Sequence, residues 1–168
     1  MSRSVLIAIP ARIGSTRFPK KPLASLGGLP VIERVRRQAE KAGVGDVVVA
    51  TDSRDIARVV EFYGGRAVMT ASNLPSGTDR VLAAARVLER GRRSRYRVVV
   101  NVQGDEPFIS PSTIRTVAGL AGRADIGTAV VPINSPAALR DSNTVKAVVC
   151  AGGRCLYFSR SPVPWAGP

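Results

Sequence analysis

Short apolar runs alternate along the chain with segments in which apolar residues recur every three or four positions. A run of β-branched and apolar residues without polar alternation is typical of a strand that is buried on both faces. Five such runs predict strands at residues 5–9, 47–50, 66–69, 96–102 and 126–131.

Helical spacing between these runs predicts four helices. The first begins at Pro30, places Ile32, Val35 and Ala39 on one face and stops at Gly43. The second is marked by apolar residues from Ile56 to Tyr63 and is closed by Gly64. The third begins at the capping-box spacing of Ser76–Asp79, and the fourth begins at the pair Ser110–Pro111. Residues 10–28 are polar and hold Gly and Pro, so we expect a loop there.

The pattern changes after Pro136. Residues 145–149 and 155–158 predict two strands, joined by the turn Ala151-Gly152-Gly153-Arg154. The order of elements is therefore β-α-β-α-β-α-β-α-β followed by a hairpin. It predicts an α/β fold with a mostly parallel central sheet.

Length and composition place the chain among ordinary globular proteins. It has 168 residues, of which 45% are hydrophobic and 22% are charged, which suits one domain. The longest nearly apolar run, residues 5–11, is too short for a membrane span or a secretory signal. We therefore expect a cytoplasmic protein with no membrane insertion. Cys150 and Cys155 lack zinc-type spacing and are expected to be buried thiols.

The charge balance and the lack of histidine narrow the chemistry. No histidine occurs, which excludes Ser-His and Cys-His catalysis and His-ligated metals within this chain. The net charge of +13 is compatible with nucleic-acid binding, with small polyanionic ligands, or with an arginine-rich composition. Six arginines lie between Arg86 and Arg97, with Tyr96 as the one aromatic among them. A stacking surface for bases is therefore poorly supported, and we expect no nucleic-acid partner.

The loop after the first strand has the groups that a triphosphate needs. Residues 10–22 hold two arginines, two lysines, two hydroxyls and a small-residue turn with exposed amides. The loop has neither the Walker A spacing nor the Rossmann glycine pattern. The alternative is a solvated basic loop.

Three further polar segments follow predicted strands, where ligands of doubly wound sheets bind. Thr51-Asp52 is also compatible with a helix cap. The capping box of the segment Ser76–Arg80 explains Ser76 and Asp79 but not Arg80. In the third segment, residues 101–107, Asp105 suits Mg²⁺, which binds one or two carboxylates together with substrate phosphates. Neighbouring residues of an extended chain point opposite ways, so Glu106 is not expected to share that ion.

Five motifs in this order resemble the 3-deoxy-manno-octulosonate cytidylyltransferases, the CMP-Kdo synthetases of lipopolysaccharide assembly. They are Ile9-Pro-Ala-Arg-x-x-Ser-Thr-Arg-x-Pro-x-Lys-Pro-Leu23, Ala50-Thr-Asp52, Ser76-Gly-Thr-Asp-Arg80, Asn101-Val-Gln-Gly-Asp-Glu-Pro107, and Tyr157-Phe-Ser-Arg160 with Pro164-Trp165. The resemblance covers the whole chain. It implies a three-layer Rossmann-like nucleotidyltransferase fold.

The resemblance also implies a reaction, in which CTP and the sugar acid Kdo give CMP-Kdo and pyrophosphate with Mg²⁺ as cofactor. It assigns Arg12, Ser15, Arg17 and Lys21 to the CTP phosphates, although Arg17 is equally compatible with bracing the loop. It assigns Arg80 and Gln103 to cytosine, Asp105 to Mg²⁺ and Arg160 to the sugar acid, with Lys21 and Asp105 as the catalytic pair. Lys20 stands where the family often has glycine and is expected at the surface.

Members of the family extend beyond the Pro-Trp segment. The resemblance therefore implies that a C-terminal part is absent here, together with a second metal-binding aspartate and much of the homodimer surface. We expect a single domain over residues 1–168, with a CTP-binding core at 1–135 and the start of the sugar-binding and dimerisation part at 136–168. An apolar patch is expected around Val163 and Trp165. The alternatives are a CTP-binding chain with little activity, or a cytidylyltransferase for another sugar acid.

Overall fold

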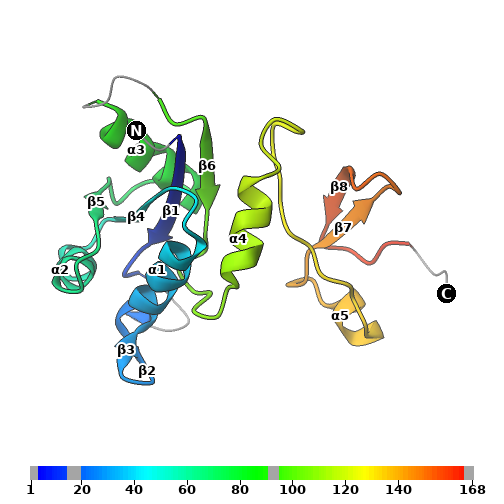
Figure 1. Cartoon of the computed structure of the whole chain (residues 1–168). Coiled ribbons are helices and arrows are strands. Elements are labelled where there is room, and N and C mark those ends of the chain that lie inside the picture. Colours follow the sequence, from blue (N-terminus) through cyan, green and yellow to red (C-terminus); the bar gives the residue numbers. More distant parts are fainter. Residues whose placement is uncertain (1–3, 15–19, 91–94, 165–168) are drawn as a thin grey trace. The chain divides into compact units, whose positions relative to one another are not determined.

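The chain folds into two compact units, Met1–Gly127 and Thr128–Pro168 (Figure 1). The structure is a computed structural model that describes residues 4–14, 20–90 and 95–164. The border between the units falls between Gly127 and Thr128. No helix within the described ranges is both long and apolar enough to cross a bilayer.

Unit 1 is built on a four-stranded parallel sheet with the strand order β5-β4-β1-β6. The strands are β1 (Val5–Ala11), β4 (Asp46–Thr51), β5 (Ala67–Met69) and β6 (Val98–Asn101). In the register, Ala11 lies beside Thr51, Thr51 beside Met69, and Ala8 beside Asn101. All four strands are parallel, so their carboxyl ends reach the same edge of the sheet.

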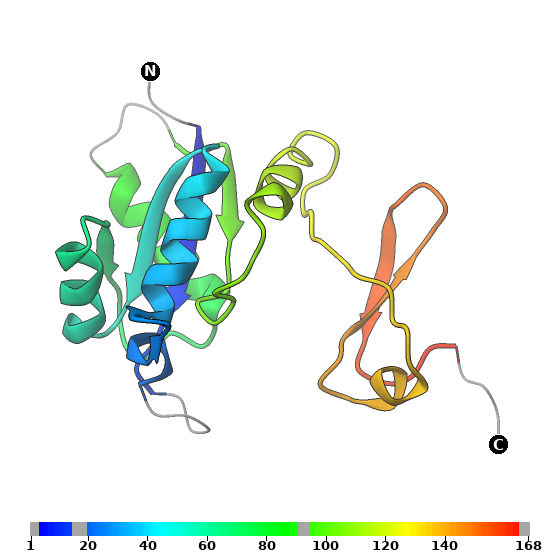
Figure 2. The same ribbon diagram turned by 60° about the horizontal axis from the view of Figure 1, so that its bottom comes forward.

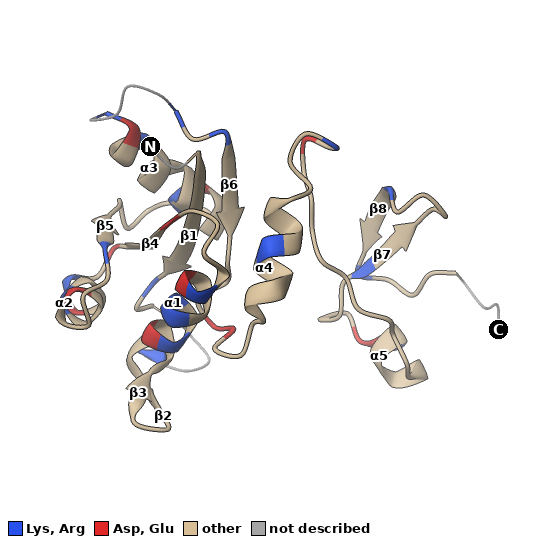
Figure 3. Ribbon diagram, in the orientation of Figure 1, with Lys and Arg blue, Asp and Glu red and all other residues tan. Residues whose placement is uncertain are grey.

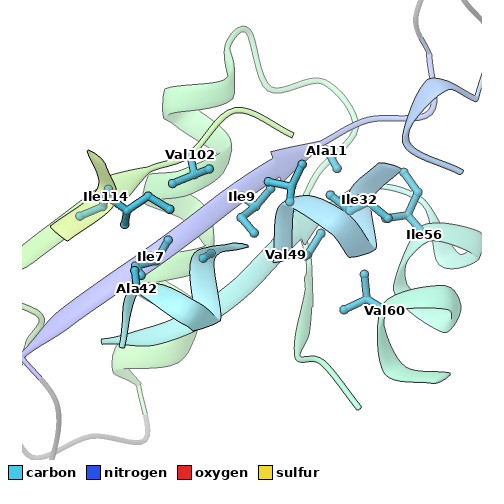
Figure 4. Close-up of a cluster of buried hydrophobic side chains, with 13 residues drawn as sticks. Ile7, Ile9, Ala11, Ile32, Ala42, Val49, Ile56, Val60, Val102 and Ile114 are labelled. Atoms are coloured by element: carbon cyan, nitrogen blue, oxygen red, sulfur yellow. The ribbon is translucent and has the colours of Figure 1, made fainter. Parts of the chain in front are cut away.

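Helices cover both faces of this sheet, which confirms the predicted three-layer α/β fold (Figures 1 and 2). On one face, α1 (Val31–Ala42), α2 (Arg54–Phe62) and α4 (Pro111–Ala118) pack against alternate strand residues such as Ile7 and Ile9 (Figure 4). On the other face, α3 (Gly77–Glu89) packs against Leu6 and Ala8. The two faces alternate along β1 because successive strand side chains point opposite ways.

The helix ends follow the signals in the sequence. Pro30 precedes α1, and Gly43 ends it in the left-handed conformation with φ 68°. The Ser76 hydroxyl accepts a hydrogen bond from the amide of Asp79, as the capping box predicts, and the Ser110 hydroxyl accepts one from the amide of Ser112.

The predicted loop over residues 10–28 contains short regular elements. A 3₁₀ helix, η1 (Lys21–Leu23), is followed by the two-residue strands β2 (Ser25–Leu26) and β3 (Leu29–Pro30), which pair antiparallel. Lys20 precedes η1 at φ 57°, in the left-handed region that favours glycine. A residue without a Cβ would adopt this conformation without strain.

Unit 2 contains the predicted hairpin, formed by β7 (Lys146–Val149) and β8 (Cys155–Ser159), together with the short helix α5 (Pro136–Arg140). Gly153 adopts φ 79° in the turn, a conformation that glycine reaches without strain. The hairpin and its preceding segment line an apolar groove of about 840 Å³. Val163 lines this groove, as the expected apolar patch requires, and Trp165 lies outside the described residues.

Two predictions are wrong. Residues 126–131 form no strand, because no described segment pairs with them, and Ile126 and Val131 are 88% and 84% exposed. An apolar run needs a hydrogen-bonding partner as well as β propensity, and the border between the units falls within this run. Cys150 and Cys155 are free thiols, as expected, but they are half-buried rather than buried, because they flank the exposed turn of residues 151–154.

Candidate functional site

The polar segments that follow the four parallel strands meet at one edge of the sheet in unit 1. Arg12 follows β1, Asp52 follows β4, Thr70 follows β5, and Gln103 and Asp105 follow β6. The backbone extends this edge beyond the strands, since the amide of Val102 donates to the carbonyl of Ala8 at 3.0 Å.

Glycines allow the loops to approach β1 closely at this edge. A Cβ on Gly104 would lie 2.6 Å from the carbonyl oxygen of Pro10, which only a residue without a side chain tolerates. A Cβ on Gly77, at the start of α3, would lie 3.3 Å from the Pro10 ring. The loop after β6 and the first turn of α3 therefore both pack on Pro10, and the site is assembled around the end of β1.

Lys21 and Asp105 form an ion pair at this edge. The Nζ of Lys21 donates to Oδ2 of Asp105 at 2.8 Å, and the two side chains are 43% and 57% exposed. The loop after β1 and the loop after β6 thus place a cation and a carboxylate side by side, both open to solvent. The lysine can bind a phosphate group, and the carboxylate can bind the cation that accompanies it.

Arg80 lies in a second, more buried ion pair. Its Nη2 donates to Oδ2 of Asp52 at 2.9 Å, and its Nη1 donates to the Thr70 hydroxyl at 2.5 Å and to the Ala71 carbonyl at 3.3 Å. The Arg80 side chain is 4% exposed and that of Asp52 is 14% exposed. Arg80 therefore ties the first turn of α3 to the ends of β4 and β5.

The other predicted site residues of unit 1 make fewer contacts in the described part of the chain. Arg12 and Gln103 are exposed, and Nε2 of Gln103 reaches Oδ1 of Asn101 at 3.4 Å. Ser15 and Arg17 lie outside the described residues.

Arg160 lies in unit 2, at the end of β8, where its exposed guanidinium donates to the carbonyl of Ser142 at 2.8 Å. Its own carbonyl accepts a hydrogen bond from Nζ of Lys146 at 3.0 Å, and the same ammonium donates to the carbonyls of Asp141 and Thr144. Lys146 is 3% exposed. This buried lysine cannot be recognised from the sequence, because one lysine in an alternating strand carries no local sign that three carbonyls surround it.

Comparisons with known proteins show the family of this chain. The chain matches the profile of the family described as cytidylyltransferase over residues 6–167. The chain belongs to the cytidylyltransferase family.

Within that family, the named relatives are 3-deoxy-manno-octulosonate cytidylyltransferases. The one from Idiomarina loihiensis is 47% identical over 165 residues, which cover 96% of this chain and 64% of that protein. The one from Methylobacterium radiotolerans is 47% identical over 170 residues, which cover 97% of this chain and 68% of that protein. The predicted resemblance is therefore confirmed, and this cytidylyltransferase chain spans 64% of the length of the first of these relatives.

A solved structure supports the same placement. The structure of CMP:2-keto-3-deoxy-manno-octonic acid synthetase complexed with CTP is 38% identical, with a TM-score of 0.80 over 96% of this chain and 66% of that chain. The fold of this cytidylyltransferase chain is thus that of a structure whose ligand is CTP.

The residues at the sheet edge are compatible with a divalent cation. No group of three or more Asp, Glu or Cys side chains lies together among the described residues, so the protein offers no complete metal cage there. Asp105 is exposed at the strand end, and a single carboxylate suffices for Mg²⁺ when phosphates and water complete the shell. Asp105 is thus a suitable ligand for a cation that arrives with a nucleotide.

Proposed function

We propose that the protein transfers the cytidylyl group of CTP to 3-deoxy-D-manno-octulosonate, giving CMP-Kdo and pyrophosphate for lipopolysaccharide biosynthesis. The observation that carries this proposal is the pair of Lys21 and Asp105 at the carboxyl edge of the sheet, in a chain of this family. The names of the relatives and the CTP complex of the similar structure support the choice of both substrates.

The proposed roles follow from charge and position. Arg12 and Lys21 bind the triphosphate, together with Ser15 and Arg17, because fixed cations next to exposed amides match phosphate oxygens. Arg80 and Gln103 recognise the cytosine. Arg160 pairs with the sugar carboxylate, for which a guanidinium is the best-matched cation.

The reaction is an in-line displacement at the α-phosphate. The anomeric hydroxyl oxygen of the sugar acid forms the new P–O bond and releases its proton to solvent. The bond from the α-phosphorus to the oxygen that bridges to the β-phosphate breaks, and pyrophosphate leaves with that electron pair. Lys21 holds phosphate oxygens in place for this attack. Asp105 would hold Mg²⁺, which neutralises charge that develops on the phosphates.

The proposal includes the setting of the reaction. We place the protein in the cytoplasm, where CTP is available, and infer a homodimer as its working form. This chain spans 64% of the length of one relative, so these properties are proposed for the whole protein.

Pyrophosphate release from CTP, Mg²⁺ and Kdo tests the proposal. We expect release that requires Kdo and that Asp105→Ala abolishes while a thermal melt remains unchanged. CTP binding without release, measured by titration calorimetry, would restrict the function of this chain to nucleotide binding. Release with other sugar acids at the same rate would contradict the choice of Kdo.

A further inference from the structure

The ion pair of Asp52 and Arg80 is incomplete in one specific way. Asp52 uses Oδ2 for Arg80, whereas its Oδ1 is buried and has no hydrogen-bond partner among the described residues. A buried carboxylate oxygen without a donor is costly, so such an atom is retained where a ligand or water supplies the donor.

Arg80 also leaves part of its hydrogen-bonding capacity unused. Its described hydrogen bonds, to Asp52, Thr70 and Ala71, use Nη1 and Nη2, and none of them uses Nε. An arginine only donates and never accepts. The pair therefore contains one unused donor, Nε of Arg80, and one unused acceptor, Oδ1 of Asp52.

The surrounding network holds this pair in place. The Thr70 hydroxyl donates to the carbonyl of Thr51 at 3.1 Å, and the Thr70 amide donates to the same carbonyl at 2.8 Å. Thr70 in turn accepts from Arg80, so the guanidinium cannot rotate without breaking contacts to both β4 and β5. Its buried position makes each of these bonds stronger than it would be in water.

We propose that Asp52 is a specificity-determining residue, which together with Arg80 selects cytosine over uracil. This inference rests on the proposed function. Cytosine has an acceptor at N3 beside a donor at its exocyclic amino group, and uracil reverses both positions. An arginine donor and a carboxylate acceptor complement the cytosine edge and oppose the uracil edge at both atoms. Neither residue touches the triphosphate in this scheme, so binding of the phosphates is independent of the pair.

The test measures the dissociation constants of CTP and UTP for the full chain by titration calorimetry with Mg²⁺. For Asp52→Asn we expect the ratio Kd(UTP)/Kd(CTP) to fall at least about tenfold, because an amide can also donate to uracil. The matched control is Asp46→Asn, at the opposite end of β4, where the carboxylate accepts from the Tyr96 hydroxyl at 3.0 Å. That variant should keep the wild-type ratio.

The outcomes separate the two claims. A wild-type chain that binds CTP, with an unchanged ratio in a folded Asp52→Asn variant, would overturn this inference and leave the proposed function standing. A wild-type chain that binds neither nucleotide would overturn both. If a thermal melt shows that Asp52→Asn does not fold, Arg80→Lys is the second test. This variant keeps a positive charge next to Asp52 but loses the fork of guanidinium donors. An unchanged ratio Kd(UTP)/Kd(CTP) in Arg80→Lys would then overturn the inference.

Discussion

The Nζ of Lys21 lies 2.8 Å from Oδ2 of Asp105, although 84 positions separate the two residues in the chain. The pair joins the loop after β1 to the loop after β6 at the edge where ligands of parallel sheets bind. Both side chains are solvent-exposed, so the pair itself contributes little to stability. Its position is thus better explained by ligand binding than by folding.

Lys21→Met should weaken CTP binding by about tenfold or more, because it removes a cation from the proposed phosphate site. Titration calorimetry with CTP and Mg²⁺ measures this change. Lys20→Met is the matched control, since Lys20 is exposed and its replacement removes the same charge one position away. Equal losses in the two variants would show that only the net charge of the loop matters.

Gly104→Ala should destabilise unit 1 by about 1–3 kcal/mol, because the new Cβ would lie 2.6 Å from the Pro10 carbonyl oxygen. The loop that carries Asp105 must then move away from β1, so CTP affinity should fall as well. Urea denaturation and calorimetry measure the two effects. Gly152→Ala, where a Cβ meets nothing within 4 Å, should change neither.

Glu33→Gln should destabilise the fold by about 3 kcal/mol, because it removes the buried carboxylate that pairs with Arg36 and leaves only the half-exposed Glu40 as its ionic partner. Glu33 is fully buried, and its two oxygens accept from Nε and Nη2 of Arg36 at 2.7 and 2.8 Å. Glu40→Gln is the control. The Glu40 side chain is 49% exposed, so its replacement should lower the free energy of unfolding by less than about 1 kcal/mol.

The Glu33 contribution should also depend on pH. Burial raises the pKa of this carboxyl, but hydrogen bonds and charge from Arg36 and Arg37 outweigh it and hold the pKa below its ordinary value of 4.5. A lowered pKa in the folded state means that the stabilisation is complete above about pH 4.5 and is lost as the pH falls through the folded pKa. Urea denaturation at pH 7 and pH 3 should therefore show a smaller difference between wild type and Glu33→Gln at pH 3.

Lys20→Gly should stabilise the chain by up to about 1 kcal/mol, because Lys20 adopts φ 57°, where a Cβ is unfavourable. The expected rise in Tm is about 2–4 °C for a chain of this size. Lys20→Ala keeps the Cβ and should give no such rise in a calorimetric scan. An equal rise in both variants would mean that loss of the positive charge, rather than relief of the backbone, is the cause.

Val131→Lys should reduce self-association of the chain. Val131 is 84% exposed and lines the apolar groove of unit 2 together with Tyr157 and Phe158. Sedimentation velocity over a range of concentrations should show association in the wild type and less in the variant. Ile126→Lys, at an equally exposed position that does not line the groove, serves as the control.

The positions of the charged residues help to explain the net charge of +13. Basic and acidic positions are interspersed along α1 and α2 (Figure 3). The buried pairs of Glu33 with Arg36 and of Asp52 with Arg80 use part of the positive charge internally. Some of the arginines are therefore structural. This reduces the need for a large polyanionic partner to explain the composition.

The sequence by itself determined the layered α/β fold, the family and most helix ends. Apolar periodicity, the capping box at Ser76 and the stop at Gly43 are local signals, and each needs only a few neighbouring residues to be read. Motif order gave Lys21 and Asp105 as site residues, but not that they touch.

Tertiary structure alone decided which groups the buried charges contact and whether the apolar run at residues 126–131 forms a strand. Asp52 and Arg80 are 28 positions apart, and Lys146 is surrounded by carbonyls from three places in unit 2. Residues 126–131 have strand propensity but no partner strand. In each case the deciding contact is non-local, because burial and pairing depend on what the folded chain brings alongside a residue rather than on its neighbours in sequence.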